Sequence, residues 1–182
     1  MAKTESLSKL QRGDRAPAFS VPGIDGRIYT PTDFVGKEGV FILFMCNHCP
    51  YVQARIGEAV ELHEEFGKQI AFVGINSSNP EYPGESADDM KAFAAERGME
   101  FPYLVDEDGA VAKAYGATCT PDPFLFNRDM RLIFHGRLVD ALEPQEPIQE
   151  RTMRDAMQKM LAGESIEPWF NPSLGCSIKF RN

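Results

Sequence analysis

Cys46 and Cys49 are the residues of this chain whose type and spacing most directly suggest chemistry. Two cysteines separated by two residues can close and reopen a disulfide, or can supply half of the ligands of a zinc site. The other two cysteines, Cys119 and Cys176, stand alone in the sequence. Because a disulfide in a reducing compartment is more often catalytic or redox-sensing than structural, the close pair favours redox chemistry.

The close pair is predicted to lie between a buried strand and the helix that follows it. Unpaired N–H groups and the macrodipole at a helix N-terminus favour a thiolate, so we expect the pKa of Cys46 to lie below that of a free cysteine. We expect this position to expose Cys46, the attacking thiol, and the helix start to bury Cys49, the resolving thiol. Protonated His48 would stabilise the thiolate further, and Pro50 suits the first helical turn, where an N–H is not needed.

Metal-binding alternatives fit the cysteine pattern less well. A zinc site would need Cys119 and Cys176 as further ligands, but these two do not form a second close pair. Copper delivery by Cys46, Cys49 and His135 would require one more residue between the two close cysteines. We therefore predict neither a metal nor another cofactor.

The elements that must position the pair follow from apolar runs and helical periodicity. The predicted strands are apolar runs at 40–45, 70–75 and 101–105, followed by an antiparallel hairpin from 124–126 and 131–138. The predicted helices cover 52–66, 86–97 and 153–161, with a brief additional helix that ends at Tyr115. This order predicts an α/β fold with a central mixed sheet, parallel in its βαβ part, and flanking helices.

The chain is expected to form a single domain over residues 1–182, with its core at about 35–163. Residues 1–34 are predicted to be an N-terminal extension with a small hairpin near 24–27. Residues 164–182 have no repeated charge and no Ser/Gly bias, so we expect this C-terminal tail to pack back on the core.

Thr120 and Pro121 form a second landmark. A proline at the start of the strand that enters the hairpin would lie beside the helix N-terminus that carries the cysteine pair. Because an X–Pro bond has only a small cis penalty, a cis bond is plausible there. The alternative is an ordinary trans proline in a loop.

Four stretches together resemble the thioredoxin-like superfamily, in its redoxin branch related to alkyl hydroperoxide reductase/thiol-specific antioxidant proteins. They are CNHCPYV at 46–52, GINS at 74–77, GATCTPD at 116–122 and SLGCSIK at 173–179. The resemblance runs from about Gly13 to the C-terminus. It implies a thioredoxin-like fold, disulfide exchange by Cys46 and Cys49, and a cis proline at Pro121 that helps to bind substrate.

Two enzymatic functions are consistent with this resemblance: thiol–disulfide exchange, and an antioxidant, peroxiredoxin-like reduction of hydroperoxides. Peroxiredoxins use a Pro-x-x-x-Thr-x-x-Cys frame, which would place Cys49 at the peroxidatic position, Cys46 at the threonine and Ile42 at the proline. The frame is therefore incomplete, and no arginine lies near 118–121 to polarise a peroxide. We favour a thiol–disulfide oxidoreductase, and a non-enzymatic binding module with idle thiols is the third alternative.

The isolated cysteines are candidates for additional redox thiols. Cys119 lies two residues before Pro121 and is expected near the rim of the site, and Cys176 in the tail can return to the same face. They could pair with each other or relay electrons to the close pair. The alternative is that both are buried, small hydrophobic side chains.

Composition excludes several other classes of protein. The chain has 182 residues, of which 43% are hydrophobic and 25% charged, as in globular domains. Its net charge of −8 disfavours nucleic acids and anionic membranes as partners. With no apolar segment suited to secretion or membrane insertion, the expected location is the cytoplasm. The expected partners are protein or small-molecule disulfides and thiols, hydroperoxides in the peroxidase alternative, and a thiol reductant system.

Overall fold

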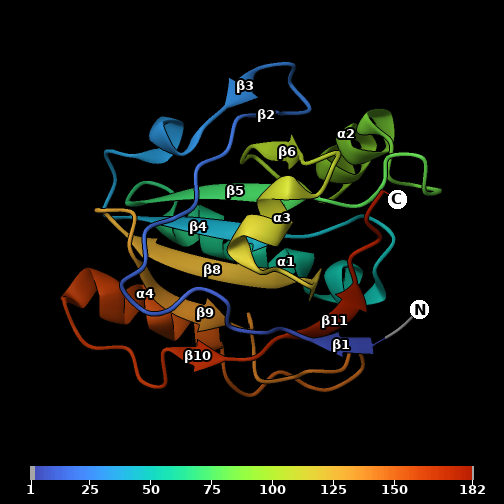
Figure 1. The fold of residues 1–182 in the computed structure, drawn as a ribbon. Coiled ribbons are helices and arrows are strands. Elements are labelled where there is room, and N and C mark those ends of the chain that lie inside the picture. Colours follow the sequence, from blue (N-terminus) through green and yellow to red (C-terminus); the bar gives the residue numbers. More distant parts are fainter. Residues whose placement is uncertain (1–2, 182) are drawn as a thin grey trace.

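A six-stranded mixed sheet forms the centre of the molecule in the computed structural model, which describes residues 3–181 (Figure 1). The strand order is β10-β9-β8-β4-β5-β6. The strands are β4 (Gly39–Phe44), β5 (Ile70–Asn76), β6 (Tyr103–Val105), β8 (Asp122–Asn127), β9 (Leu132–Gly136) and β10 (Phe170–Asn171). β4, β5 and β6 are parallel, whereas β8 runs antiparallel to both β4 and β9, and β10 is parallel to β9.

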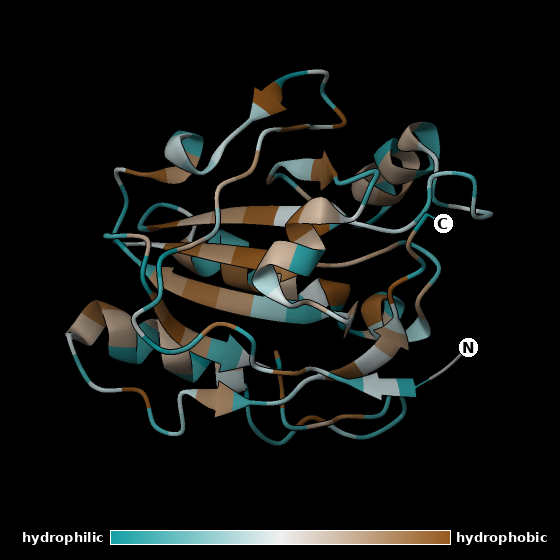
Figure 2. Ribbon diagram, in the orientation of Figure 1, coloured by the Kyte–Doolittle hydropathy of each residue, from teal (hydrophilic) through white to brown (hydrophobic). Residues whose placement is uncertain are grey.

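Helices cover both faces of this sheet. They are α1 (Pro50–Phe66), α2 (Ala87–Glu96), α3 (Ala110–Tyr115) and α4 (Thr152–Ala162), with a 3₁₀ helix at Pro31–Phe34. Figure 1 shows α3 in front of the sheet and α1 behind it. Every residue of β4 is buried, as expected for a central strand with helices on both sides, and the hydropathy colouring of Figure 2 shows apolar residues along β4, β5 and β8.

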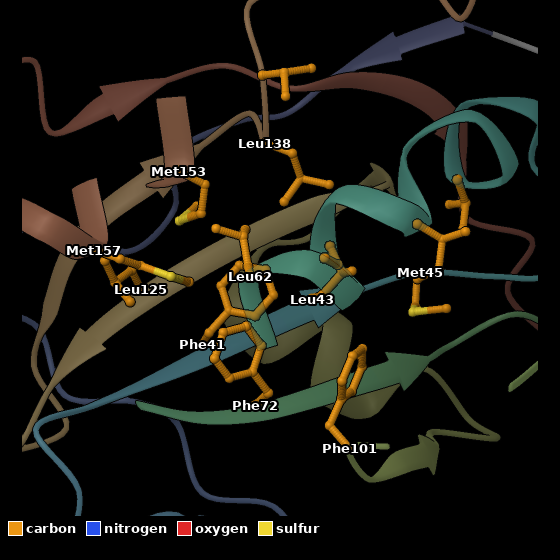
Figure 3. Packing of buried hydrophobic residues seen from close by; sticks show 14 of the residues in the cluster. Phe41, Leu43, Met45, Leu62, Phe72, Phe101, Leu125, Leu138, Met153 and Met157 are labelled. Atoms are coloured by element: carbon orange, nitrogen blue, oxygen red, sulfur yellow. The ribbon is translucent and has the colours of Figure 1, made fainter. Parts of the chain in front are cut away.

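The side chains of β4 alternate between two hydrophobic cores. Phe41 and Leu43 belong to the core that includes buried residues of α1, α2 and α4, and Figure 3 shows them with Leu62 of α1 and Met153 of α4. Phe44 belongs to the opposite core, which includes α3 and the N-terminal segment. This alternation follows from the two-residue period of a strand and fixes the end of β4 between two packed layers.

Two smaller sheets complete the fold. β2 (Val21–Pro22) and β3 (Ile28–Tyr29) form an antiparallel hairpin. The second small sheet has the order β1-β11-β7 and is antiparallel throughout; it joins β1 (Lys3–Glu5) and β11 (Leu174–Ser177) to β7 (Cys119–Thr120). Segments from the two ends of the chain therefore lie side by side next to Thr120 (Figure 1).

The predicted fold class is confirmed, and each strand and helix predicted between residues 40 and 163 is present within a few residues of its expected bounds. The sequence did not predict β1, β7, β10 or β11. These strands have two to four residues each, too few to produce a recognisable hydrophobic alternation. Within residues 3–181, none of the helices combines the length and the apolar composition that crossing a membrane requires.

Candidate active site

The cysteine pair lies where β4 ends and α1 begins. Cys49 is the N-cap residue of α1, and Pro50 is the first helical residue, as predicted. Cys46 lies in the loop before the helix. Its residue exposure is 2% and that of Cys49 is 0%, so the expectation that this position exposes Cys46 is wrong. Gly84 and Glu85, in the loop before α2, and Thr120, in β7, contact this loop and its cysteines.

Thr120 contacts both sulfur atoms. Its hydroxyl Oγ1 lies 3.2 Å from Cys46 Sγ, and its carbonyl oxygen lies 3.1 Å from Cys49 Sγ, from which it accepts a hydrogen bond when Cys49 is protonated. The Thr120–Pro121 bond is cis, as the resemblance implied. The structure therefore brings four of the sequence-predicted site residues, Cys46, Cys49, Thr120 and Pro121, to one place.

Glu85 is a site residue that the sequence did not reveal. It is 1% exposed, and its carboxylate accepts hydrogen bonds from the backbone N–H groups of Asn47 (3.1 Å) and His48 (2.8 Å). Asn76 Nδ2 also donates to it at 2.6 Å, and His48 Nδ1 donates to the same carboxylate. The buried carboxylate of Glu85 thus holds in place Asn47 and His48, the two residues between the cysteines. In the sequence, Glu85 resembles a solvated loop residue next to the helix cap Ser86, which gave no signal of burial.

Asn47 fixes the cysteine loop through its side chain. Its Nδ2 donates to the carbonyl of Gly84 at 2.8 Å, and its Oδ1 accepts from the hydroxyl of Tyr103 at 3.0 Å. The carbonyl of Asn47 accepts a further hydrogen bond of 2.9 Å from Gln53 Nε2 in α1. Because these contacts join the loop to β6 and α1, the conformation of the pair is determined by the surrounding scaffold.

The two thiols have opposite pKa shifts. The pKa of Cys49 is lowered to about 5, first by its interaction with the Cys46 thiol and further by the N–H of Val52 in the first turn of α1. The pKa of Cys46 is raised by that same interaction, by burial and by the negative charge of Glu85. The expectation of a lowered pKa at Cys46 is therefore wrong: the helix start acts on Cys49, which occupies the N-cap, and the first proton leaves the pair from there.

His48 pairs with Glu85 and stacks against a tyrosine. Its ring centroid lies 4.4 Å from that of Tyr82, and its Nδ1 faces Glu85 as described above. The predicted stabilisation of a Cys46 thiolate by protonated His48 would therefore be opposed by the adjacent carboxylate of Glu85.

The two isolated cysteines occupy different environments. Cys176, in β11, belongs to the buried cluster that contains Cys46 and Cys49, whereas Cys119, in β7, is not part of that cluster and has its pKa raised mainly by burial. Only one of the two candidate redox thiols therefore joins the site.

Within residues 3–181, three side chains lie close enough together to bind a metal ion. Cys46, His48 and Glu85 each offer one ligand atom, and these atoms lie within 4.8 Å of one another. Such a set suits Zn²⁺, although both oxygens of Glu85 already accept hydrogen bonds. The copper-binding set considered from the sequence is not assembled, because His135 is buried and its Nε2 bonds with Asp122 at 2.8 Å.

The mixed sheet with its flanking helices, and the dithiol beside a cis proline, define a protein of the thioredoxin-like class. The model of the AhpC/TSA family matches residues 12–135, and the chain belongs to this family. Family membership confirms the resemblance stated from the sequence.

Similar proteins include both functional types considered from the sequence. Thiol-disulfide oxidoreductase ResA from Geobacillus thermodenitrificans is 29% identical over 120 residues, which cover 64% of each chain. Putative peroxiredoxin MT2597 from Mycobacterium tuberculosis is 28% identical over 121 residues, 64% of this chain and 69% of that protein. The match to the Geobacillus protein spans slightly less than two thirds of that relative's length.

Solved structures resemble the chain over its whole length. An uncharacterized conserved protein from Geobacillus kaustophilus is 38% identical, with a TM-score of 0.93 over 100% of this chain and 97% of that one. A hypothetical protein from Sinorhizobium meliloti is 34% identical, with a TM-score of 0.92 over 98% of each chain. The small strands formed by the tail are therefore part of a fold shared beyond the family model's range.

Proposed function

We propose that this protein is a thiol–disulfide oxidoreductase in which Cys46 attacks and Cys49 resolves. The observation that carries the proposal is the pair of adjacent sulfurs, both contacted by Thr120, with one pKa lowered to about 5. At neutral pH such a pair holds one thiolate and one thiol, the state needed to begin disulfide exchange.

The reaction starts with a proton shift within the pair. The proton of Cys46 moves to the Cys49 thiolate, and Cys46 Sγ attacks one sulfur of a substrate disulfide, releasing the other as a thiolate. The proton on Cys49 passes to that leaving sulfur. Cys49 Sγ then attacks Cys46 Sγ, closes the Cys46–Cys49 disulfide and releases the second substrate sulfur. The substrate gains two electrons and the pair loses two.

The assignment of Cys46 as the attacking thiol rests on its surroundings. Cys46 is 2% exposed, whereas Cys49 is fully buried. The sulfur of Cys49 faces the Thr120 carbonyl and interacts with Cys176. We therefore assign the attack on an incoming disulfide to Cys46. A thiol reductant system would reverse the two steps and restore the dithiol.

Protein disulfides are the substrate class that the surface beside the pair favours. A cavity next to Pro121 is lined by Tyr51, Leu138, Val139 and Leu174, together with polar groups that include Arg55 and Arg137. The apolar groups of this lining would lie against apolar side chains of an extended peptide docked on the surface, while Arg137 would favour acidic flanking residues.

Peroxide reduction is less well supported. The negative charge of Glu85, which contributes to the raised pKa of Cys46, would repel the charge that develops on a peroxide oxygen. The similarity to a putative peroxiredoxin makes the activity worth measuring in the same experiment.

A redox titration with thiol trapping tests the proposal. Wild-type protein is equilibrated in buffers of defined dithiol/disulfide ratio, quenched with acid, alkylated and mapped. We expect one two-electron transition that closes a Cys46–Cys49 disulfide, and catalysis of insulin disulfide reduction that is abolished in Cys46→Ser and retained in Cys119→Ser. Cys49→Ser should accumulate a mixed disulfide with substrate at Cys46. Turnover of hydroperoxide at a rate exceeding that of insulin reduction, or a pair that stays reduced at every ratio, would overturn the proposal.

A further inference from the structure

The C-terminal tail brings a third sulfur to the site. β11 pairs with β7 in antiparallel register, and Cys176 lies directly opposite Thr120. Residues directly opposite each other on neighbouring strands have side chains on the same face. Because the Thr120 hydroxyl contacts Cys46 Sγ, this is the face that carries the reactive pair, and Cys176 belongs to the same buried cluster as Cys46 and Cys49.

Cys119 lies on the opposite face of the same strand. It is adjacent to Thr120 in sequence and opposite Ser177 in register, so its side chain points away from the pair. Unless β7 rearranges, Cys119 and Cys176 therefore cannot form the direct disulfide that was considered from the sequence. Cys119 is also a buried thiol close to the site, so its replacement serves as a matched control for replacement of Cys176.

The close approach of β11 depends on Gly175. A Cβ at this position would lie 1.9 Å from the carbonyl oxygen of Thr120 and 3.2 Å from the nitrogen of Pro121. Any side chain there would push β11 away from the segment that contacts both sulfurs. On its other edge β11 pairs with β1, where Lys3 lies opposite Cys176, so the strand is held from both sides.

We propose that Cys176 is a third redox thiol that takes over the disulfide from the Cys46–Cys49 pair, an inference that rests on the function proposed above. The Cys176 thiolate attacks Cys49 Sγ, the Cys46–Cys49 bond breaks, a Cys49–Cys176 bond forms, and Cys46 leaves as a thiolate. The proton released by Cys176 ends on Cys46 or in solvent. One disulfide is exchanged for another, so no further oxidant or reductant is needed.

The transfer returns Cys46 to the thiol state while the oxidised bond is held against the tail. The protein then has two oxidised isomers, one with the disulfide across the active-site loop and one between α1 and β11. The pKa of Cys176 is raised to about 12, first by burial and then by its interaction with Cys49. Because only the thiolate attacks and burial raises the pKa of Cys176, the transfer should be slower than closure of the first disulfide and should accelerate as pH rises.

Disulfide mapping after limited oxidation tests the proposal. Trypsin places the active-site pair in residues 38–55, Cys119 in 114–128 and Cys176 in 160–179. Reduced protein is oxidised with one equivalent of oxidised glutathione, quenched with acid at intervals from seconds to hours and alkylated before digestion. In wild type and Cys119→Ser we expect the internal disulfide of peptide 38–55 first, and later a cross-linked 38–55/160–179 species that fragmentation assigns to Cys49. Its rate of appearance should rise with pH.

Two further variants separate the inference from the proposed function. Cys176→Ser should stop at the Cys46–Cys49 disulfide, and Cys46→Ser should form the Cys49–Cys176 disulfide directly. If the wild type forms only the Cys46–Cys49 disulfide at every time and pH, and Cys46→Ser yields only a mixed disulfide with glutathione, the role of Cys176 is refuted while the proposed function stands. If the Cys46–Cys49 disulfide never forms, the proposed function fails instead.

Discussion

Replacement of Glu85 by glutamine tests whether one buried carboxylate holds the active-site loop. Its Oε1 accepts hydrogen bonds from the backbone and the ring of His48, and its Oε2 accepts from the backbone of Asn47 and the side chain of Asn76. A glutamine amide has one oxygen, so the two donors that meet its nitrogen end lose their acceptor in either orientation. A buried donor without a partner costs about 1–3 kcal/mol, which gives a loss of about 2–6 kcal/mol.

Burying a neutral amide costs less than burying a carboxylate, so we expect the observed loss in the lower part of this range, about 2–4 kcal/mol. The assay is urea denaturation of the reduced protein at neutral pH, with the m-value compared between variants to verify two-state behaviour. Glu64→Gln, an exposed change on α1, is the matched control and should remain within about 0.5 kcal/mol of wild type.

A second readout separates the charge of Glu85 from its hydrogen bonds. Since the carboxylate raises the pKa of Cys46, Glu85→Gln in a Cys49→Ser background should lower the pH at which Cys46 forms a thiolate, measured by ultraviolet thiolate absorbance. A variant as stable as wild type, with an unchanged thiolate titration, would refute the view that Glu85 organises this loop.

Three further predictions concern the elements around the pair. Thiolate absorbance should rise as pH increases through about 5, since Cys49 is charged above its pKa, and this step should move to higher pH in Cys46→Ala, which removes the largest cause of the shift. Gly175→Ala should lower the free energy of unfolding by about 1–3 kcal/mol in denaturant titrations, because its Cβ overlaps the Thr120 carbonyl. It should also reduce the yield of the Cys49–Cys176 cross-link, and an unchanged yield would contradict the packing described. Ser86→Ala should cost about 1 kcal/mol in the same titration by removing the cap of α2 that accepts from Asp89, and a neutral result would argue against the capping box.

Much of the fold could be predicted because its central elements have strong, local patterns. The apolar run of β4 and the helical period of α1 determine where the cysteine pair lies, and both are visible in a single segment of sequence. The pairing of β11 with β7 left no such signal. It depends on the absence of a side chain at Gly175 and on a register between segments more than fifty residues apart, and neither feature has a periodicity.

Buried polar partners were missed for a related reason. Asp122 and His135 are both fully buried and bonded to each other across neighbouring strands, yet each is an ordinary polar residue in the sequence. Glu85 is equally inconspicuous between Gly84 and Ser86. Burial of a charge is decided by long-range packing that supplies its hydrogen-bond donors, and no local pattern records which loop will be covered.

The interaction with Cys49 and burial are the main causes of the raised pKa of Cys46, and the position of Glu85 adds to them in displacing the expected thiolate to Cys49. The backbone N–H groups of Asn47 and His48, which immediately follow Cys46, are the nearest donors in sequence that could stabilise a charge on its sulfur, and both already bond to the Glu85 carboxylate. A second negative charge on Cys46 would therefore face a carboxylate and lack these donors. Cys49 keeps the N–H of Val52 and the thiol of Cys46, so the charge is more stable there until an incoming disulfide draws the proton across the pair.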